Sequence, residues 1–185
     1  MLKKFVVLAV LLCSTALMAF PRHGMLPDGE KYTYEGVKVC GMCHKSEKSG
    51  NQLGIWQKSA HSKAYETLKS AEANKIAQAK YGKNAIDVPE CLSCHVTGHG
   101  MDASMLGSKF SMEDGVQCET CHGPGSAYKS MKIMKDRKEA VKNGLKVYDK
   151  PAELCVTCHN DKSPTFKSFD FDKMWAKIKH DVPKQ

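Results

Sequence analysis

The feature that most constrains this chain is a five-residue motif, Cys-x-x-Cys-His, which occurs at residues 40–44, 91–95, 118–122 and 155–159. We refer to these as the first, second, third and fourth motif. Two thiols three positions apart can form thioethers to the two vinyl groups of one porphyrin, and the adjacent histidine can then bind the iron. The motifs therefore predict four covalently bound haem c groups. The predicted attachment residues are Cys40, Cys43, Cys91, Cys94, Cys118, Cys121, Cys155 and Cys158, and the predicted proximal ligands are His44, His95, His122 and His159.

Zinc knuckles and thioredoxin-like redox sites also use Cys-x-x-Cys pairs. Neither kind of site requires histidine as the fifth residue. Histidine supplies 8 of the 185 residues, so its occurrence in all four motifs by chance has a probability on the order of 10⁻⁶. Every cysteine after Cys13 also belongs to a motif. The haem interpretation is therefore favoured over the zinc and redox alternatives.

The N-terminus has the layout of a secretory signal peptide over residues 1–19. Two lysines precede a short apolar run, and small residues follow, with predicted cleavage after Ala19 or Ala16. Leu12 is bulkier than the residue that lipoprotein signals place before the lipidated cysteine, which disfavours lipidation of Cys13. No later segment is apolar enough to span a bilayer. We therefore predict a periplasmic or extracellular protein, since haem c is attached outside the cytoplasmic membrane.

Residues 20–185 are expected to form a single tetrahaem domain. About 165 residues for four haems leave about 41 residues per haem, too few for a large core of apolar side chains. The haems must then form much of the core, and the apoprotein should be largely unfolded. The sequence pattern predicts a mainly α protein with extensive loops and a compact multihaem cytochrome c fold.

The net charge of +8 overstates the basicity of the mature holoprotein. Loss of the two signal-peptide lysines leaves +6. Each ferric haem with two ionised propionates contributes about −1, so the oxidised holoprotein carries about +2. This balance gives little support for a nucleic-acid partner. We expect redox proteins as donor and acceptor, while peripheral membrane association and self-association stay open.

Apolar residues recur at helical spacing from Leu53 to Leu68, which predicts one amphipathic helix. His61 lies at the edge of its apolar face, toward the haem-filled interior. A neutral imidazole there would meet either a hydrogen-bond partner or an iron. With four irons to ligate, we predict that His61 is a distal ligand.

Helical patterns recur in two later segments. A helix is predicted from Ala71 to Lys80, ended by Gly82. Another is predicted over residues 126–142, after the turn at Gly123-Pro-Gly125, and a left-handed cap at Asn143-Gly144 should end it. Between the second and third motifs the sequence predicts a tight, glycine-rich connection.

The C-terminal residues 169–180 predict an Asp-capped helix. His180 ends this helix beside its apolar face, where it can close over a haem, so we predict His180 as a second distal ligand. The apolar face consists of Phe171, Met174, Trp175 and Ile178.

Four other residues are candidate ligands. His99, in the glycine-rich connection, could bind a neighbouring haem or line a proton-bearing pocket, or it could contact a propionate or lie exposed on the loop. His23 lies in an irregular N-terminal arm and is either a surface residue or a ligand. Met131 and Met134 are spaced for core packing, but a thioether can also ligate haem iron.

Five stretches of sequence resemble one protein family beyond the haem motif itself. They are Cys40-x-x-Cys-His-Lys45, Ala60-His61-x-Lys63-Ala64, Cys91-x-x-Cys-His-Val96-x-Gly98, Gly115-Val-x-Cys-Glu-x-Cys-His-Gly-Pro-Gly125 and Phe171-Asp-x-Met174. On these stretches the chain is similar to the tetrahaem cytochrome c-554 family, known from ammonia-oxidising bacteria as an electron acceptor for hydroxylamine oxidoreductase.

The resemblance implies a mostly helical protein with closely packed haems, most of them bis-histidine, and one five-coordinate haem in the best-known member. It implies that His61 corresponds to a distal ligand and that His180 lies near one, offset by a residue or two. The family's other distal histidine falls after the Gly-Pro-Gly turn, where this chain has Tyr128. His23, His99 and the methionines are the substitutes available.

Three functions are compatible with this sequence. We predict an exported electron carrier that passes electrons between redox partners through closely packed haems, with no catalytic residues. One alternative is an enzyme that reduces a small nitrogen-oxide ligand at a five-coordinate haem, although no lysine replaces a proximal histidine as in dedicated nitrite reductases. Another is a polymerising, electron-conducting extracellular cytochrome. Four non-motif histidines suffice for every iron, so their number does not decide between these functions.

Overall fold

The computed structural model of the chain describes residues 32–181. The predicted signal peptide and His23 lie outside the described residues.

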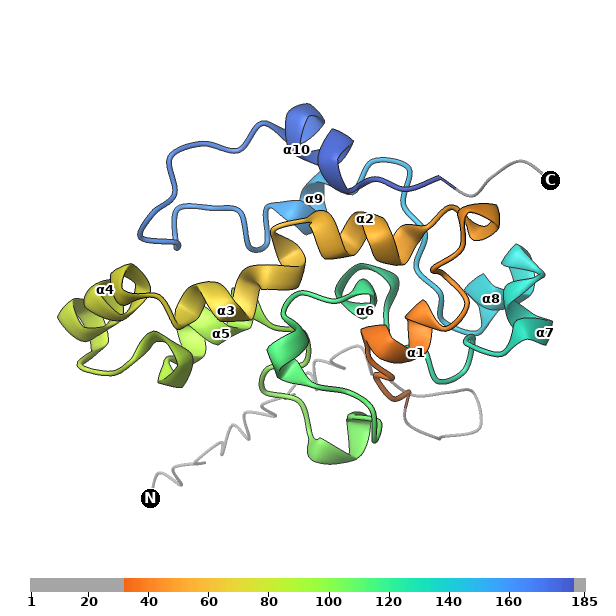
Figure 1. Cartoon of the computed structure of the whole chain (residues 1–185), viewed down its shortest axis with the longest axis horizontal. Coiled ribbons are helices and arrows are strands. Elements are labelled where there is room, and N and C mark those ends of the chain that lie inside the picture. Colours follow the sequence, from red (N-terminus) through yellow and green to blue (C-terminus); the bar gives the residue numbers. More distant parts are fainter. Residues whose placement is uncertain (1–31, 182–185) are drawn as a thin grey trace, which may run out of the picture.

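Short helices joined by turns and loops make up the described part of the chain (Figure 1). Between residues 32 and 181 the strand-like pairing is one isolated parallel bridge, between Tyr34 and Leu106. No helix in this range has the length and apolar character needed to cross a bilayer. The predicted mainly helical, loop-rich fold is therefore confirmed. The α-helices are α1 (Val37–Gly41), α2 (Gln52–Lys58), α3 (Ala64–Leu68), α4 (Ala71–Tyr81), α5 (Pro89–His95), α6 (Cys118–His122), α7 (Met131–Met134), α8 (Arg137–Lys142), α9 (Ala152–Cys155) and α10 (Phe171–Ile178), and the 3-10 turns are η1 (Glu47–Ser49), η2 (His61–Lys63), η3 (Ala85–Asp87), η4 (Ala103–Met105) and η5 (Met112–Asp114).

The helices are arranged along the length of α2 and α3, which cross the middle of the molecule (Figure 1). α4 and α5 lie at one end of the view, and α7 and α8 lie at the other. α3 contacts both α4 and α5, α1 contacts α2 and α6, and α7 contacts α8. The third motif, on α6, is thereby held near the centre.

Each motif lies on or beside a short helix. α5 ends at His95, α6 coincides with the third motif, α1 contains Cys40 and α9 ends at Cys155. Side chains three positions apart on a helical turn are neighbours on its surface. The local helix therefore directs both thiols of a motif to the same side.

The prediction of one helix over residues 53–68 is wrong, because the chain breaks between α2 and η2. Ser59 is extended there, and its hydroxyl donates to the Trp56 carbonyl at 2.7 Å. The hydroxyl of Ser62 donates to the carbonyls of Gln57 and Ser59. Serine side chains that bond nearby carbonyls compete with the helical hydrogen-bond pattern, which accounts for the break.

The prediction of one helix over residues 126–142 is also wrong. α7 begins only after Ser130, whose hydroxyl accepts a backbone hydrogen bond, and α8 begins after Asp136, whose carboxylate accepts two. Each of these side chains caps a new helix start. Tyr128 therefore lies in the turn before α7, and Met131 is 65% exposed, so they do not share a helix face.

Other predicted helix ends agree with the structure. Gly82, with a left-handed φ of 66°, caps the C-terminus of α4, and Asp170 caps the N-terminus of α10 by accepting a bond from the Lys173 N–H. Gly123, with φ 77°, ends α6, and Gly144, with φ 99°, lies just beyond α8. Glycine is needed at such positions because other residues rarely adopt positive φ.

Few apolar side chains are buried among residues 32–181. One cluster forms where α3, α4, η3 and α5 meet, and several large apolar side chains elsewhere are exposed, including Met42 at 59%. The polypeptide thus has the thin core predicted from its length, which agrees with cofactors supplying much of the burial. The cluster contains Leu68, Ala77, Ala85 and Val88.

Candidate haem-binding site

Thiols of different motifs lie next to one another in a defined order. The Cys40 thiol of the first motif lies beside the Cys118 thiol of the third, close enough for each thiol to shift the pKa of the other. Cys121, also of the third motif, lies near the thiols of the fourth, and burial together with neighbouring thiols, Cys155 foremost, raises the pKa of Cys121 to about 11. The Cys158 thiol in turn lies near Cys94 of the second motif, which helps burial to raise the pKa of Cys158. The order in space is therefore first, third, fourth, second.

Three motif histidines have their Nδ1 atom hydrogen-bonded to an oxygen. These oxygens only accept, so Nδ1 must carry the proton and Nε2 keeps its lone pair. A metal-binding histidine is commonly oriented in this way, with Nε2 directed to the metal. The bonds run from His95 to the Ala64 carbonyl (2.7 Å), from His122 to the Lys146 carbonyl (2.9 Å) and from His44 to Gln52 Oε1 (3.3 Å).

Two motif histidines face a second imidazole. The rings of His61 and His159 have centres 6.0 Å apart, and those of His122 and His180 have centres 5.8 Å apart. Two imidazoles on opposite sides of one metal ion, with metal–nitrogen bonds of about 2 Å, have ring centres about 6 Å apart. Both pairs therefore have the separation of a bis-histidine site. The ring of His159 also stacks on Phe169 at 4.7 Å.

The segment before the third motif holds His61 in place. The Val116 N–H donates to the His61 carbonyl at 3.0 Å, and the Trp56 indole N–H donates to the Val116 carbonyl at 2.7 Å. Gly115, with φ 75°, allows this close approach, because a Cβ at this position would lie 2.7 Å from the His61 oxygen. The break between α2 and α3 thus places His61 by contacts with a segment more than 50 residues later in the chain.

His180 reaches His122 from the end of α10. Its Nδ1 lies 3.1 Å from the Ile178 carbonyl and donates to it, which leaves Nε2 unprotonated. Asp170 fixes the start of the same helix. His180 thus has the same hydrogen-bond pattern as three of the motif histidines.

Burial favours the neutral form of three of these imidazoles. Burial lowers the pKa of His61, His122 and His159, and the neighbouring His159 lowers the pKa of His61 further. The backbone bond to Lys146 partly opposes this effect at His122. The neutral imidazole is the form that binds a metal.

The sequence that carries these thiols and imidazoles matches one known family of proteins. A sequence model described as "Cytochrome c554 and c-prime" matches residues 39–123, which include the first three motifs and His61. Cytochrome c-554 of Nitrosomonas europaea is 33% identical over 141 residues, which make up 68% of this chain and 57% of that protein. The chain belongs to the cytochrome c554 family. It spans 57% of the length of this relative, and no solved structure matches it.

Membership of the cytochrome c554 family makes the chain a multihaem c-type cytochrome with covalently bound haem c, and it implies a role in electron transport. The residues present fit such groups. Each motif offers two thiols on one helical turn, and the Nδ1 bonds leave Nε2 available to bind iron at three motifs. The paired imidazoles of the third and fourth motifs have the spacing that a ligand on each face of the haem requires.

Other predicted ligands of this cytochrome lie apart from these pairs. Within the described residues, the histidine–histidine ring contacts are the two above, and His44, His95 and His99 take part in neither. The Tyr128 hydroxyl donates to the Gly123 carbonyl at 2.6 Å, and burial, aided by Glu119, raises the pKa of this phenol. Tyr128 is therefore held as a protonated structural donor.

Glu119, which lies between the two cysteines of the third motif, was not predicted from the sequence to have a structural role. Glu119 is 1% exposed and accepts three backbone hydrogen bonds, from Glu35 and Gly36 at 2.8 Å and from Gly125 at 2.7 Å. Burial raises the pKa of this carboxyl, and the three N–H groups partly oppose that shift. A charged residue between two haem cysteines gives no local signal of such burial.

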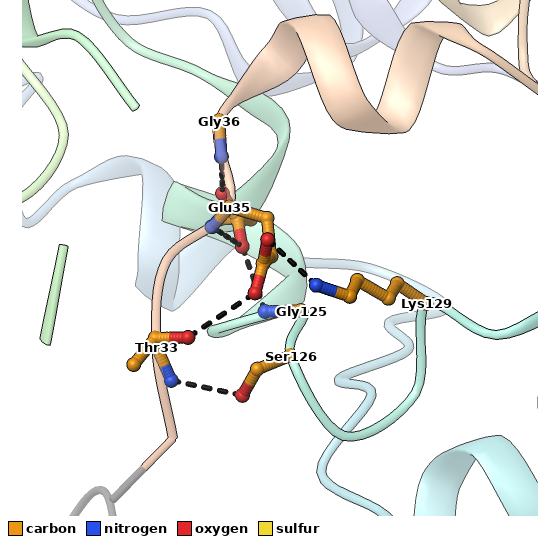
Figure 2. Close-up of polar contacts among 7 residues, drawn as sticks. Thr33, Glu35, Gly36, Gly125, Ser126 and Lys129 are labelled. Atoms are coloured by element: carbon orange, nitrogen blue, oxygen red, sulfur yellow. Dashed lines mark hydrogen bonds and ion pairs between the residues drawn. The ribbon is translucent and has the colours of Figure 1, made fainter. Parts of the chain in front are cut away.

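Figure 2 shows the segments that Glu119 joins. The Thr33 N–H donates to the Ser126 hydroxyl at 2.9 Å, and Lys129 forms an ion pair with Glu35 at 2.7 Å. The arm before the first motif is therefore attached to the turn after the third. Because Glu119 of the third motif bonds the arm before the first, this network holds the first and third motifs together.

Proposed function

We propose that the chain is a tetrahaem electron carrier whose haems form one continuous path in the order first, third, fourth, second motif. The observation that carries this proposal is the proximity of thiols between successive motifs of that order, shown by their mutual effect on pKa. Each haem iron, when bound, takes up and releases one electron. Thioether bonds at adjacent thiols would bring the edges of neighbouring haems close together, which is what transfer between them requires.

The polypeptide would contribute different surroundings along this path. The two inner positions, at the third and fourth motifs, would each have two histidine ligands, with His180 and His61 on the distal side. The two outer positions lack such a pair among residues 32–181. We therefore assign transfer within the protein to the inner haems, and exchange with exported redox partners to the outer ones.

The proposal is tested by mass spectrometry and electron paramagnetic resonance of the exported holoprotein. The intact mass should equal the mature chain plus four haems, and the oxidised irons should show magnetic coupling between neighbours. A mass with fewer haems, or four magnetically isolated irons, would contradict the proposed path.

A second candidate function is the binding and reduction of a small nitrogen oxide at an outer haem. The absence of a histidine pair at His44 and His95, within the described residues, favours it. Catalytic reduction of nitric oxide by the purified protein with a chemical electron donor would support this function. Binding without turnover would leave electron transfer as the role of the protein.

A further inference from the structure

The proximal histidine of the first motif differs from two others in the group that accepts its Nδ1 hydrogen. For His95 and His122 the acceptor is a backbone carbonyl. For His44 it is Oε1 of Gln52, at 3.3 Å. A backbone carbonyl is present whatever the side chain, whereas the acceptor for His44 depends on the residue at position 52. This hydrogen bond can therefore be altered by substitution of one side chain.

The orientation of the Gln52 amide is fixed by a second bond. Its Nε2 donates to the Ser49 carbonyl. Because an amide nitrogen donates and an amide oxygen accepts, Oε1 is the atom directed at His44. His44 must then donate through Nδ1, which leaves Nε2 for the haem iron.

The loop between the first motif and α2 is built to hold Gln52 at this place. Asn51 is the one non-glycine residue with positive φ, 46°, among residues 32–181. Its side chain accepts the Gly54 N–H at 3.1 Å and donates to Glu47 at 2.7 Å. The Leu53 N–H donates to the His44 carbonyl at 2.9 Å. The backbone on either side of Gln52 is thus fixed relative to His44.

We propose that Gln52 is a positioning residue that sets the reduction potential of the haem at the first motif. A hydrogen bond from Nδ1 makes the imidazole a stronger electron donor, which stabilises ferric iron and lowers the potential. The amide of Gln52 provides a moderate acceptor, so the potential lies between the limits set by a carboxylate and by no acceptor. The inference rests on the proposed function, since it requires a haem at the first motif.

The test compares Gln52→Glu and Gln52→Leu in the holoprotein by potentiometric titration followed by visible absorbance. A carboxylate is the stronger acceptor, so Gln52→Glu should move one haem transition to lower potential. Gln52→Leu should move the same transition to higher potential, and the near-isosteric Gln52→Met should do the same if the leucine variant loses haem. Gln57→Glu and Gln57→Leu, on the exposed side of α2, are matched controls and should leave this transition in place.

Opposite shifts identify a hydrogen-bond effect, because a purely structural role of Gln52 would move both variants in the same direction. Shifts of the same sign, or no shift in either variant, overturn the inference. Intact masses separate this failure from that of the proposed function. Four haems with unshifted potentials overturn the role of Gln52 alone, whereas a wild-type protein without haem at the first motif overturns both.

Discussion

Replacement of Glu119 by glutamine and by leucine should destabilise the protein to different extents. Both substitutions remove the buried charge, so the cost of burying that charge cancels between them. Glutamine can keep an oxygen at the position of Oε1, which accepts from Glu35 and Gly125, whereas leucine leaves these N–H groups unpaired. Two buried hydrogen bonds at about 1 kcal/mol each make Glu119→Leu about 2 kcal/mol less stable than Glu119→Gln, or about 30-fold in the unfolding constant.

Guanidinium unfolding of the holoprotein at one pH, followed by circular dichroism, measures both free energies. Glu113, an exposed residue on η5 in the segment before the third motif, supplies the matched control. Glu113→Gln and Glu113→Leu should differ by less than about 0.5 kcal/mol. Equal stabilities of the two Glu119 variants would refute the role of this side chain as an acceptor that joins three segments.

Three further predictions concern ligation and pH. His61→Ala and His180→Ala should each convert a different low-spin haem to a high-spin or ligand-exchangeable form, because an iron loses one imidazole; an unchanged paramagnetic resonance spectrum would remove that histidine from the ligand set. The reduced protein should bind carbon monoxide or nitric oxide at an outer haem. Two results together would contradict this: all haems low-spin in the oxidised protein, and no spectral change of the reduced protein under saturating nitric oxide. Because burial raises the pKa of Glu119 above its ordinary value of 4.5, the folded state binds a proton more tightly than the unfolded state. Wild-type protein should therefore lose stability relative to Glu119→Gln as pH rises from 4.5 through the raised pKa, and parallel pH profiles from denaturant titrations would contradict it.

The parts of the site that short sequence patterns specify could be predicted. The motif spacing specifies the thiol pairs. The end of α4 at Gly82 and the start of α10 at Asp170 could each be predicted from a single residue type. The structure brings the His61 ring to His159 even though the predicted helix is interrupted. The Val116 N–H holds the His61 carbonyl, so contacts with the later segment place this imidazole where a continuous helix was predicted to place it.

Features that depend on distant segments could not be predicted from the sequence. Nothing in the spacing of the motifs indicates that the first lies beside the third, because that contact depends on backbone N–H groups that Glu119 reaches across more than 80 residues. The position of Gln52 depends on the left-handed conformation of Asn51. Asparagine adopts this conformation more readily than most residues, but the sequence alone does not require it here. The break at Ser59 likewise depends on hydroxyl bonds that compete with a helix pattern.

The two imidazole pairs have a consequence for the topology of the chain. His61 and His159 are separated by 98 positions, and His122 and His180 by 58. Under the proposed ligation, each iron links two histidines that are distant in the sequence, as a disulfide would link two cysteines. Closing loops of this length lowers the entropy of the unfolded chain, which stabilises the folded state by about 4–5 kcal/mol per link. Among the described residues, the cysteines form no disulfide with one another. The chain would therefore be cross-linked through coordination bonds, which can open and close again without any change in its covalent structure.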